Sequence, residues 1–253
     1  MLRFYRYAKI VFGVLLFLVI FNTLGSSQPP LPRFTIGVDP ARTPQEVSVS
    51  LQILLLLTIL SLAPSILIML TSFMRVYIVL AFIPRALTTQ NIPPNQVLVG
   101  LALFITLYIM WPIFTKSYNE GIRPYIDGKI TAEKAFDNTM KPIREFMFKQ
   151  TNEKYIYQFI RMANLPRPQT RDNVPTYVLI PAFIVNELTV SFYMGAILLI
   201  PFLIIDIVVS SILISMGMFF LPPVVISFPV KIIFFFLIDG WALTINKVVL
   251  SFF

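Results

Sequence analysis

Residues 200–223 read IPFLIIDIVVSSILISMGMFFLPP, a long apolar run that ends in a glycine, four apolar residues and a proline pair. A link between two helices normally meets water and is polar. Here the positions between Gly217 and Pro223 carry methionine, phenylalanine and leucine. Because glycine and proline both interrupt helices, the stretch predicts two apolar helices joined by an apolar turn at 217–223.

The composition of the whole chain is that of an integral membrane protein. Of its 253 residues, 57% are hydrophobic and 13% are charged, whereas about 25% charged residues are usual in a soluble domain. Hydrophobic runs long enough to cross a bilayer are helical unless they close into a barrel. We therefore predict an all-α, multi-pass membrane protein.

Two residue types that carry much of protein chemistry are missing. The chain has no histidine and no cysteine, which removes the usual metal ligands, the usual general base near neutral pH and all thiol chemistry. The net charge is +8, but the basic residues between 116 and 171 are mixed with acidic ones and form no stripe. We predict no catalytic residue, metal, cofactor or nucleic-acid partner, and hence no enzyme.

Prolines and charges divide most of the chain into apolar and polar stretches. Pro64 is expected to kink the first apolar run, and the prolines between 84 and 94 mark a loop after it. A charged stretch follows the second run. The predicted apolar helical segments are 49–83, 97–115, 176–216 and 224–253, with a loop at 84–96 and an amphipathic helical segment at 116–175.

Two amphipathic helices are expected inside the charged segment. Thr131 is placed to cap the first helix, with Glu133 in its first turn, and Pro142 suits the first position of a second helix. Apolar residues recur at spacings of three and four, which indicates one face turned toward a partner. These residues are Ile143, Phe146, Met147, Ile156, Phe159 and Ile160.

The N-terminus has the three-part pattern of a secretory signal peptide. A basic start is followed by IVFGVLLFLVIF, without a polar side chain, and then by small residues at 25–27. Twelve helical residues rise only ~18 Å, well short of the ~30 Å hydrocarbon core. Residues 1–25 are predicted to be a cleaved signal peptide, with an uncleaved anchor helix as the alternative. The proline-rich residues 26–48 are predicted to be an extracytoplasmic linker.

Orientation follows from the signal peptide. The loop 84–96 and the turn 217–223 would lie inside, and the segment 116–175 outside. The many basic residues of 116–175 point the other way, because cytoplasmic loops are enriched in lysine and arginine. That rule weakens for loops of about 60 residues, so we keep the first orientation.

Five charged residues lie in or beside apolar runs. A lone charge at the centre of a bilayer costs at least ~2.5 kcal/mol, so such residues tend to face a partner or a water-filled space. Asp206 and Lys231 lie on consecutive apolar segments joined by the turn at 217–223, and can meet if the first arm is broken or longer than the second. Such charges serve either as a proton or ion relay or as buried pairs that fix helix register. The residues are Arg75, Glu187, Asp206, Lys231 and Asp239.

Five long motifs follow one another along the chain. They are SLAPSILIMLTSFMRVYIVL (61–80), PPNQVLVGLALF (93–104), PIREFMFKQT (142–151), IPFLIIDIVVSSILISMGMFFLPP (200–223) and FPVKIIFFFLIDGW (228–241). Together they resemble the FliP family of flagellar biosynthetic proteins. The resemblance covers the chain from about residue 47 to its end, and it implies kinked helical hairpins that assemble into a conical oligomeric pore.

The resemblance also implies a function and partners. Members of the family form the core of the flagellar type III export gate in the bacterial inner membrane, where about five copies join FliQ and FliR. The export proteins FlhA and FlhB, the flagellar basal body, membrane lipid and unfolded export substrates are the other implied partners. Virulence injectisomes carry a related subunit, which is one alternative, and an ion or solute transporter is another.

The family gives the apolar turn a role. A run of methionines at the positions of Met218, Phe219 and Phe220 projects into the pore of FliP-like proteins and forms a gasket. Flexible apolar side chains can close such a ring, and a hydrophobic constriction blocks ions by dewetting. This chain departs from the pattern, because two of the three residues are phenylalanine. The family also pairs Asp206 with Lys231. Without the resemblance, an ordinary packed turn would explain the stretch.

Overall fold

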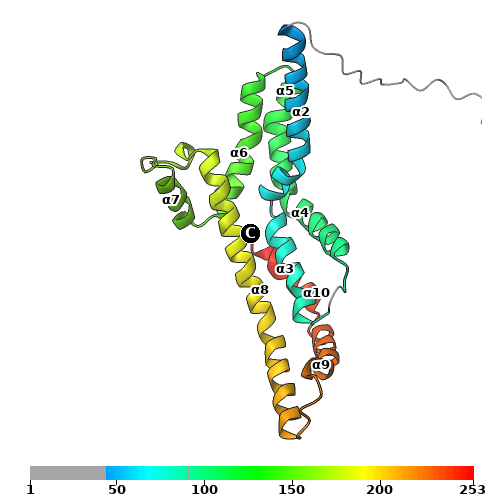
Figure 1. The fold of residues 1–253 in the computed structure, drawn as a ribbon. Coiled ribbons are helices and arrows are strands. Elements are labelled where there is room, and N and C mark those ends of the chain that lie inside the picture. The colour runs from blue at the N-terminus through cyan, green and yellow to red at the C-terminus, as the bar shows by residue number, and fades with distance from the viewer. Residues whose placement is uncertain (1–43, 90–91) are drawn as a thin grey trace, which may run out of the picture. The chain divides into compact units, whose positions relative to one another are not determined.

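The computed structural model describes residues 44–89 and 92–253, and the regular structure in these ranges is all helical (Figure 1). The predicted all-α fold class is confirmed. The predicted signal peptide, 1–25, and linker residues 26–43 lie outside the described residues. The chain divides into two units, 1–55 and 56–253. Residues 44–55, the start of the first described helix, belong to the first unit, and all packing below concerns the second.

The helices follow the order of the apolar and charged stretches. A π-helical turn and a 3₁₀ turn also occur in the charged segment. The elements are α2 (Pro44–Met69), α3 (Phe73–Ala86), α4 (Asn95–Ser117), η2 (Tyr118–Ile122), α5 (Arg123–Ile126), α6 (Ala132–Gln150), α7 (Glu153–Met162), η3 (Arg171–Asn173), α8 (Thr176–Ser215), α9 (Pro223–Leu237) and α10 (Gly240–Leu250).

Within residues 44–89 and 92–253, two helical stretches are long and apolar enough to cross a membrane, namely Asn95–Ile126 and Thr176–Ser215. A third span is possible if α9 and α10, which are bent by 61° at their junction, count as one. At 1.5 Å per residue, the 40-residue α8 is ~60 Å long, about twice the hydrocarbon core. At the usual tilts of membrane helices, part of α8 therefore lies outside the hydrocarbon.

Prolines interrupt the helices less than the sequence predicts. Helix α2 continues through Pro64, and the break within the predicted segment 49–83 falls at residues 70–72. Helix α8 runs through both Pro181 and Pro201. The prediction that Pro142 starts a helix is wrong, because Pro142 lies inside α6. One proline removes a single helical hydrogen bond, and packing of the remaining turns can hold the helix together.

The predicted boundaries differ from the structure in two other places. Helix α3 includes Pro84 and ends at Ala86, and α4 begins at Asn95, so the loop is shorter than 84–96. The last predicted segment, 224–253, is divided into α9 and α10 at residues 238–239. Both differences arise where a helix end is set by tertiary packing as well as by the local sequence.

Four other described helices pack on α8. Figure 1 shows α3 beside it, and α6, α7 and α9 also contact it, while α10 packs on α3. The core between α3 and α8 is closed by side chains that water does not reach. Among them are Val76, Leu80 and Ile83 of α3 and Leu179, Ala182 and Phe183 of α8.

The charged segment forms the expected amphipathic helices. Phe146 and Met147 of α6 and Ile156 and Ile160 of α7 are buried, as their spacing predicts. The predicted cap is confirmed, because Thr131 Oγ1 accepts a hydrogen bond from the backbone N–H of Lys134. The second helix begins only at Glu153, where Asn152 accepts from the N–H of Lys154 at 3.0 Å.

A close helix contact determines how α4 passes into α5. In the π-helical turn, Gly121 lies against α6, and a Cβ there would lie 2.7 Å from the backbone nitrogen of Thr139 and 2.8 Å from the carbonyl oxygen of Ala135. Both atoms belong to backbone and cannot rotate away. Glycine at this position therefore allows η2 and α6 to approach each other.

We expect Gly121→Ala to lower the melting temperature of the purified protein, because α6 must shift to admit the methyl group. Gly100→Ala is the matched control, since Gly100 lies inside α4 and a Cβ there meets nothing within 4 Å. Alanine is favoured over glycine inside a helix by roughly 0.5–1 kcal/mol, so this control should hold or raise the melting temperature. Equal effects of the two changes would contradict the packing role of Gly121.

Candidate functional site

The turn between α8 and α9 is built to end one helix and begin the next. Gly217 has φ +75°, which glycine adopts without strain. The N–H groups of Gly217 and Met218 donate to the carbonyls of Ile214 and Leu213 at 2.9 and 3.0 Å, which is a Schellman motif. Pro223 occupies the first turn of α9, where its missing N–H costs nothing. The turn is thus fixed at both ends.

The middle of this turn presents apolar side chains outward. In the single chain, Phe220 is 100% exposed and Phe219 71%, while Met218 and Leu221 are about two-fifths exposed. Water does not stabilise such a cluster, and exposed apolar patches usually mark a contact with protein or lipid. The three residues predicted for the gasket therefore lie together at one end of the α8–α9 hairpin, and no other described part of the chain covers Phe220.

Asp206 and Lys231 join the two arms of this hairpin. Lys231 Nζ lies 2.6 Å from Asp206 Oδ2, and Ser227 Oγ donates to Asp206 Oδ1 at 2.6 Å. Ser227 and Lys231 are one helical turn apart on α9, so they approach the carboxylate from the same face. The side chain of Lys231 is 2% exposed and that of Asp206 is 30% exposed.

The lengths of the two helical arms explain why these side chains meet. Asp206 lies nine residues before the end of α8 at Ser215, and Lys231 lies eight residues after the start of α9 at Pro223. Because the irregular residues all lie in the turn itself, neither arm needs a break to bring the two charges together.

A second ion pair lies deeper in the protein, between Arg75 of α3 and Glu187 of α8. Arg75 donates Nε to Glu187 Oε2 at 2.9 Å and its Nη2 to Glu187 Oε1. This is a bidentate pair, the strongest geometry for arginine and carboxylate. The two side chains are only 3% and 0% exposed. The sequence predicts that both charged residues are buried, but it does not predict that they pair with each other.

Three residues that the sequence does not single out complete this pair. Arg75 Nη1 donates to Ser251 Oγ at 3.0 Å, and Nη2 donates to Gln150 Oε1 at 3.2 Å. The ring of Phe252 stacks 4.0 Å from the guanidinium carbon. Gln150 in turn donates to the carbonyl of Phe252 at 3.0 Å. A buried arginine needs several acceptors, but nothing local in the sequence indicates which residues supply them.

Asp239 does not belong with the buried charges. Its side chain is exposed, and none of the ion pairs in the described ranges involves it. Asp239 also does not continue the helix of Lys231, because α9 ends at Leu237 and Asp239 adopts φ +50° at the corner before α10. The Asp-Gly dipeptide at 239–240 is a turn signal in the sequence that indicates this break.

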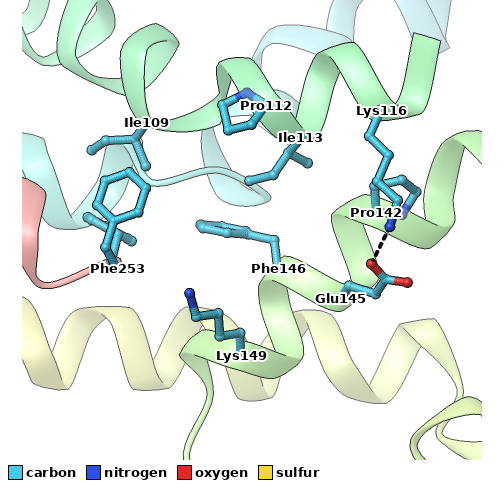
Figure 2. A pocket seen from close by; sticks show the side chains of 10 residues that line it. Ile109, Pro112, Ile113, Lys116, Pro142, Glu145, Phe146, Lys149 and Phe253 are labelled. Carbon is cyan, nitrogen blue, oxygen red and sulfur yellow. Dashed lines mark hydrogen bonds and ion pairs between the residues drawn. The ribbon is translucent and has the colours of Figure 1, made fainter. Parts of the chain in front are cut away.

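A groove between α4 and α6 is lined by charged side chains, which are the kind of groups that an active site uses. Figure 2 shows Phe146 and Phe253 in this groove, which has a volume of about 310 Å³. Lys116 and Glu145 form an ion pair at its rim, with 2.9 Å between Nζ and Oε2. The pair is exposed and no nucleophile accompanies it. Among residues 44–89 and 92–253, no group of three acidic side chains can hold a metal ion.

Comparison with known proteins places this architecture in a family. A model of the FliP family matches residues 56–248.

The chain belongs to the FliP family.

Three FliP relatives illustrate the extent of the match. The flagellar biosynthetic protein FliP of Treponema pallidum (strain Nichols) is 49% identical over 224 residues, which cover 88% of this chain and 83% of the relative. Flagellar biosynthetic protein FliP of Bacillus subtilis (strain 168) is 45% identical over 217 residues, covering 86% of this chain and 98% of the relative. The Aquifex aeolicus (strain VF5) protein of the same name is 43% identical over 205 residues, covering 80% and 86%.

The range matched to the FliP family contains both ion pairs and the apolar turn. Ser251 and Phe252, which complete the surroundings of Arg75, lie just beyond it. The features described above therefore belong mainly to the part of the chain that is similar to FliP proteins.

We expect Arg75→Ala to destabilise the protein by roughly 3–5 kcal/mol, because it leaves Glu187 buried without its opposite charge. The remaining contact of that carboxylate is with Asn186 Nδ2 at 3.5 Å. Thermal unfolding in detergent and resistance to trypsin measure the effect. Glu145→Ala removes an exposed ion pair and should change both measurements little. A comparable loss in the two variants would contradict a special role for the buried pair.

Asp206→Ala should damage the hairpin more than Lys231→Ala. The first change leaves a lysine that is 2% exposed without its opposite charge, at a cost of roughly 3–5 kcal/mol. The second change leaves a carboxylate that is 30% exposed and still accepts a hydrogen bond from Ser227. The swap of Asp206→Lys with Lys231→Asp should restore part of the folded yield. Single variants that fold and assemble normally but fail to export would instead favour a proton or ion relay.

Proposed function

We propose that this protein is a core channel-forming subunit of the flagellar type III protein export gate. In this role it passes unfolded flagellar subunits across the inner membrane while the flagellum is assembled. Membership of the FliP family supports the flagellar function over an injectisome, because the relatives described above are flagellar biosynthetic proteins. The observation that carries the channel proposal is the exposed apolar turn at 217–223.

The turn acts as the seal of the closed channel. Several copies of the chain each present Met218, Phe219 and Phe220 to one axis, and the ring of apolar side chains excludes water. A hydrophobic constriction of this kind stops ions by dewetting without any charged gate. Phenylalanine is bulkier and stiffer than methionine, so this seal holds tightly but deforms less easily than a ring of methionines.

The proposed assembly contains about five copies of the chain together with FliQ and FliR. The export proteins FlhA and FlhB and the flagellar basal body are its further partners. The chain itself offers extensive apolar surface for such contacts, since Phe104, Trp111, Phe192 and Ile207 are each more than half exposed. We propose that partner helices and lipid share this surface in the complex.

The length of α8 supports a partly extracytoplasmic position. A helix of ~60 Å exceeds the hydrocarbon core, so the hairpin and the charged segment need not lie at the same depth. We propose that residues 1–25 are a cleaved signal peptide and that 26–48 and 116–175 lie on the extracytoplasmic side. Amino-terminal sequencing of the protein extracted from membranes tests this, since Met1 or Leu2 at the mature terminus contradicts it.

A transporter of ions or small solutes is the rival function. It would use Asp206, Lys231 and Asp239 as a relay. The contacts do not favour it, because Lys231 is paired with Asp206, whose other carboxylate oxygen accepts from Ser227, while Asp239 lies exposed at a separate corner. Uptake of a small solute by liposomes that contain the isolated chain would favour the transporter.

The main prediction concerns the seal. Replacing Met218, Phe219 and Phe220 by alanine should leave the complex assembled and raise its ion conductance in planar bilayers. The short side chains of alanine leave an opening that is too wide to exclude water. Cells that carry this variant should leak ions, which membrane-potential dyes detect. Unchanged conductance of the assembled triple variant would falsify the seal.

Two controls make the test specific. Replacing only Phe219 and Phe220 by methionine keeps an apolar ring and should preserve both the closed state and secretion. Replacing Ile233, which is 60% exposed on α9 away from the turn, by alanine should not raise the conductance. Leakage in the Ile233 variant would show that conductance reports general loosening instead of the turn.

A further inference from the structure

An apolar groove lies between α8 and α10, outside the ion pairs and the turn. Its volume is about 440 Å³. One wall is the stripe of α8 from Met194 to Phe202, and the other is the stripe of α10 from Gly240 to Val248. In both stripes the lining positions are spaced by three and four residues, so each wall is one continuous helix face about 12 Å long.

The floor and one end of the groove are closed. Val79 of α3 forms the floor and Phe235 of α9 closes one end, and these residues are 2% and 3% exposed. On the rim, Ile197 and Leu243 are about half exposed. The groove is therefore a cleft that is open along one side, and nothing in the described part of the chain fills it.

The chemistry of the walls excludes water as the natural occupant. Thr244 is the one neutral polar side chain among the lining residues, and its Oγ1 already donates to the carbonyl of Gly240 at 2.7 Å. Ordered water needs two to four polar partners, which these walls do not offer. An apolar occupant is required.

Lys247 is the one cationic residue among those that line the groove, and it lies at the end opposite Phe235. Phe202 packs against Phe235 with 6.3 Å between ring centroids, whereas Ser251, just beyond α10, bonds Arg75 near Glu187. Helix α10 therefore runs antiparallel to α8, and Lys247 lies at the Met194 end. The side chain of Lys247 is exposed, and no ion pair in the described ranges engages it.

We propose that this groove binds one acyl chain of a phospholipid whose anionic headgroup lies beside Lys247. The chain runs from Lys247 toward Phe235, between helix faces that are apolar enough to lie in a membrane. Lipid tails gain little hydrophobic energy on leaving the bilayer, so selectivity comes from the headgroup. One lysine near an anionic headgroup raises the affinity about fivefold.

One hydrocarbon chain with an anionic group at one end matches the groove, which is apolar along about 12 Å and has its one cation, Lys247, at one end. The flexibility of such a chain suits a cleft whose two walls belong to separate helices.

The experiment uses the fluorescence of Trp241. Its ring packs 5.7 Å from that of Phe235 at the closed end of the groove, and Trp111 is the one other tryptophan of the chain. The full chain with Trp111→Phe is reconstituted in phosphatidylcholine bilayers. Phosphatidylglycerol or phosphatidylcholine with brominated acyl chains is then added at a low mole fraction, because bromine quenches nearby tryptophan.

Half-maximal quenching by the brominated phosphatidylglycerol should need about one-fifth of the mole fraction that the phosphatidylcholine needs. Lys247→Gln should abolish this difference, whereas Lys141→Gln on α6 should keep it. Leu243→Phe fills the groove and should weaken quenching by both lipids. Ile233→Phe, which adds the same kind of ring to the outer side of α9, should not.

Three results would overturn the proposal. They are equal quenching by the two lipids in the parent chain, a headgroup preference that survives Lys247→Gln, and quenching that is unaffected by Leu243→Phe. The same titration on the complex purified from native membranes tests the assembled state. Loss of quenching there, with quenching retained in the isolated chain, would show that a partner chain covers the groove in place of lipid.

Discussion

A charge that is buried among apolar helices needs an opposite charge beside it, and Arg75 and Glu187 meet this requirement where several elements converge. Arg75 also binds the end of α6 through Gln150 and the segment after α10 through Ser251. Apolar packing has little directional preference, so helices with smooth hydrophobic faces can slide or rotate with small changes in energy. The bidentate pair and its neighbours remove that freedom, and they set the register of α3, α6 and the C-terminal segment against α8.

The second pair does the same for the hairpin. Asp206 lies 19 residues after Glu187 on α8, or ~28 Å along the helix axis, and it holds α9 in place through Ser227 and Lys231. Between these two polar points, Thr189 of α8 accepts a hydrogen bond from Tyr155 of α7 at 3.1 Å, and beyond it the helix packs on aromatic side chains such as Phe82 and Phe235. At Gly195 the ring of Phe82 packs directly on the helix, where any Cβ would overlap it. The groove between α8 and α10 begins near Gly195, between the two ion pairs. The pairs therefore fix the positions of the helices that form its walls.

The parts of the fold that depend on neighbouring residues could be predicted from the sequence. The cap at Thr131, the buried stripes of α6 and α7 and the apolar turn follow from spacing within a few residues. Asp206 and Lys231 could be expected to meet because one short turn joins their helices. Arg75 and Glu187 are separated by 112 positions, and no local pattern relates them. Pro142 misled for a related reason, because contacts with distant helices keep α6 continuous through it.

The two ion pairs also limit which parts of a channel built from this chain can move when it opens. The hairpin is held ~14 Å from the end of α8 by Asp206, and its turn is fixed by the bonds of Gly217 and Met218 on one side and by Pro223 on the other. Residues 216–222 are the part of the hairpin that lies outside both helices, and among them Phe219 and Phe220 are 71% and 100% exposed. In the proposed gate, opening therefore needs rotation of Met and Phe side chains, whereas parting the helices would expose a buried lysine. A passing polypeptide can displace side chains at small cost, and the same hairpins can then close behind it.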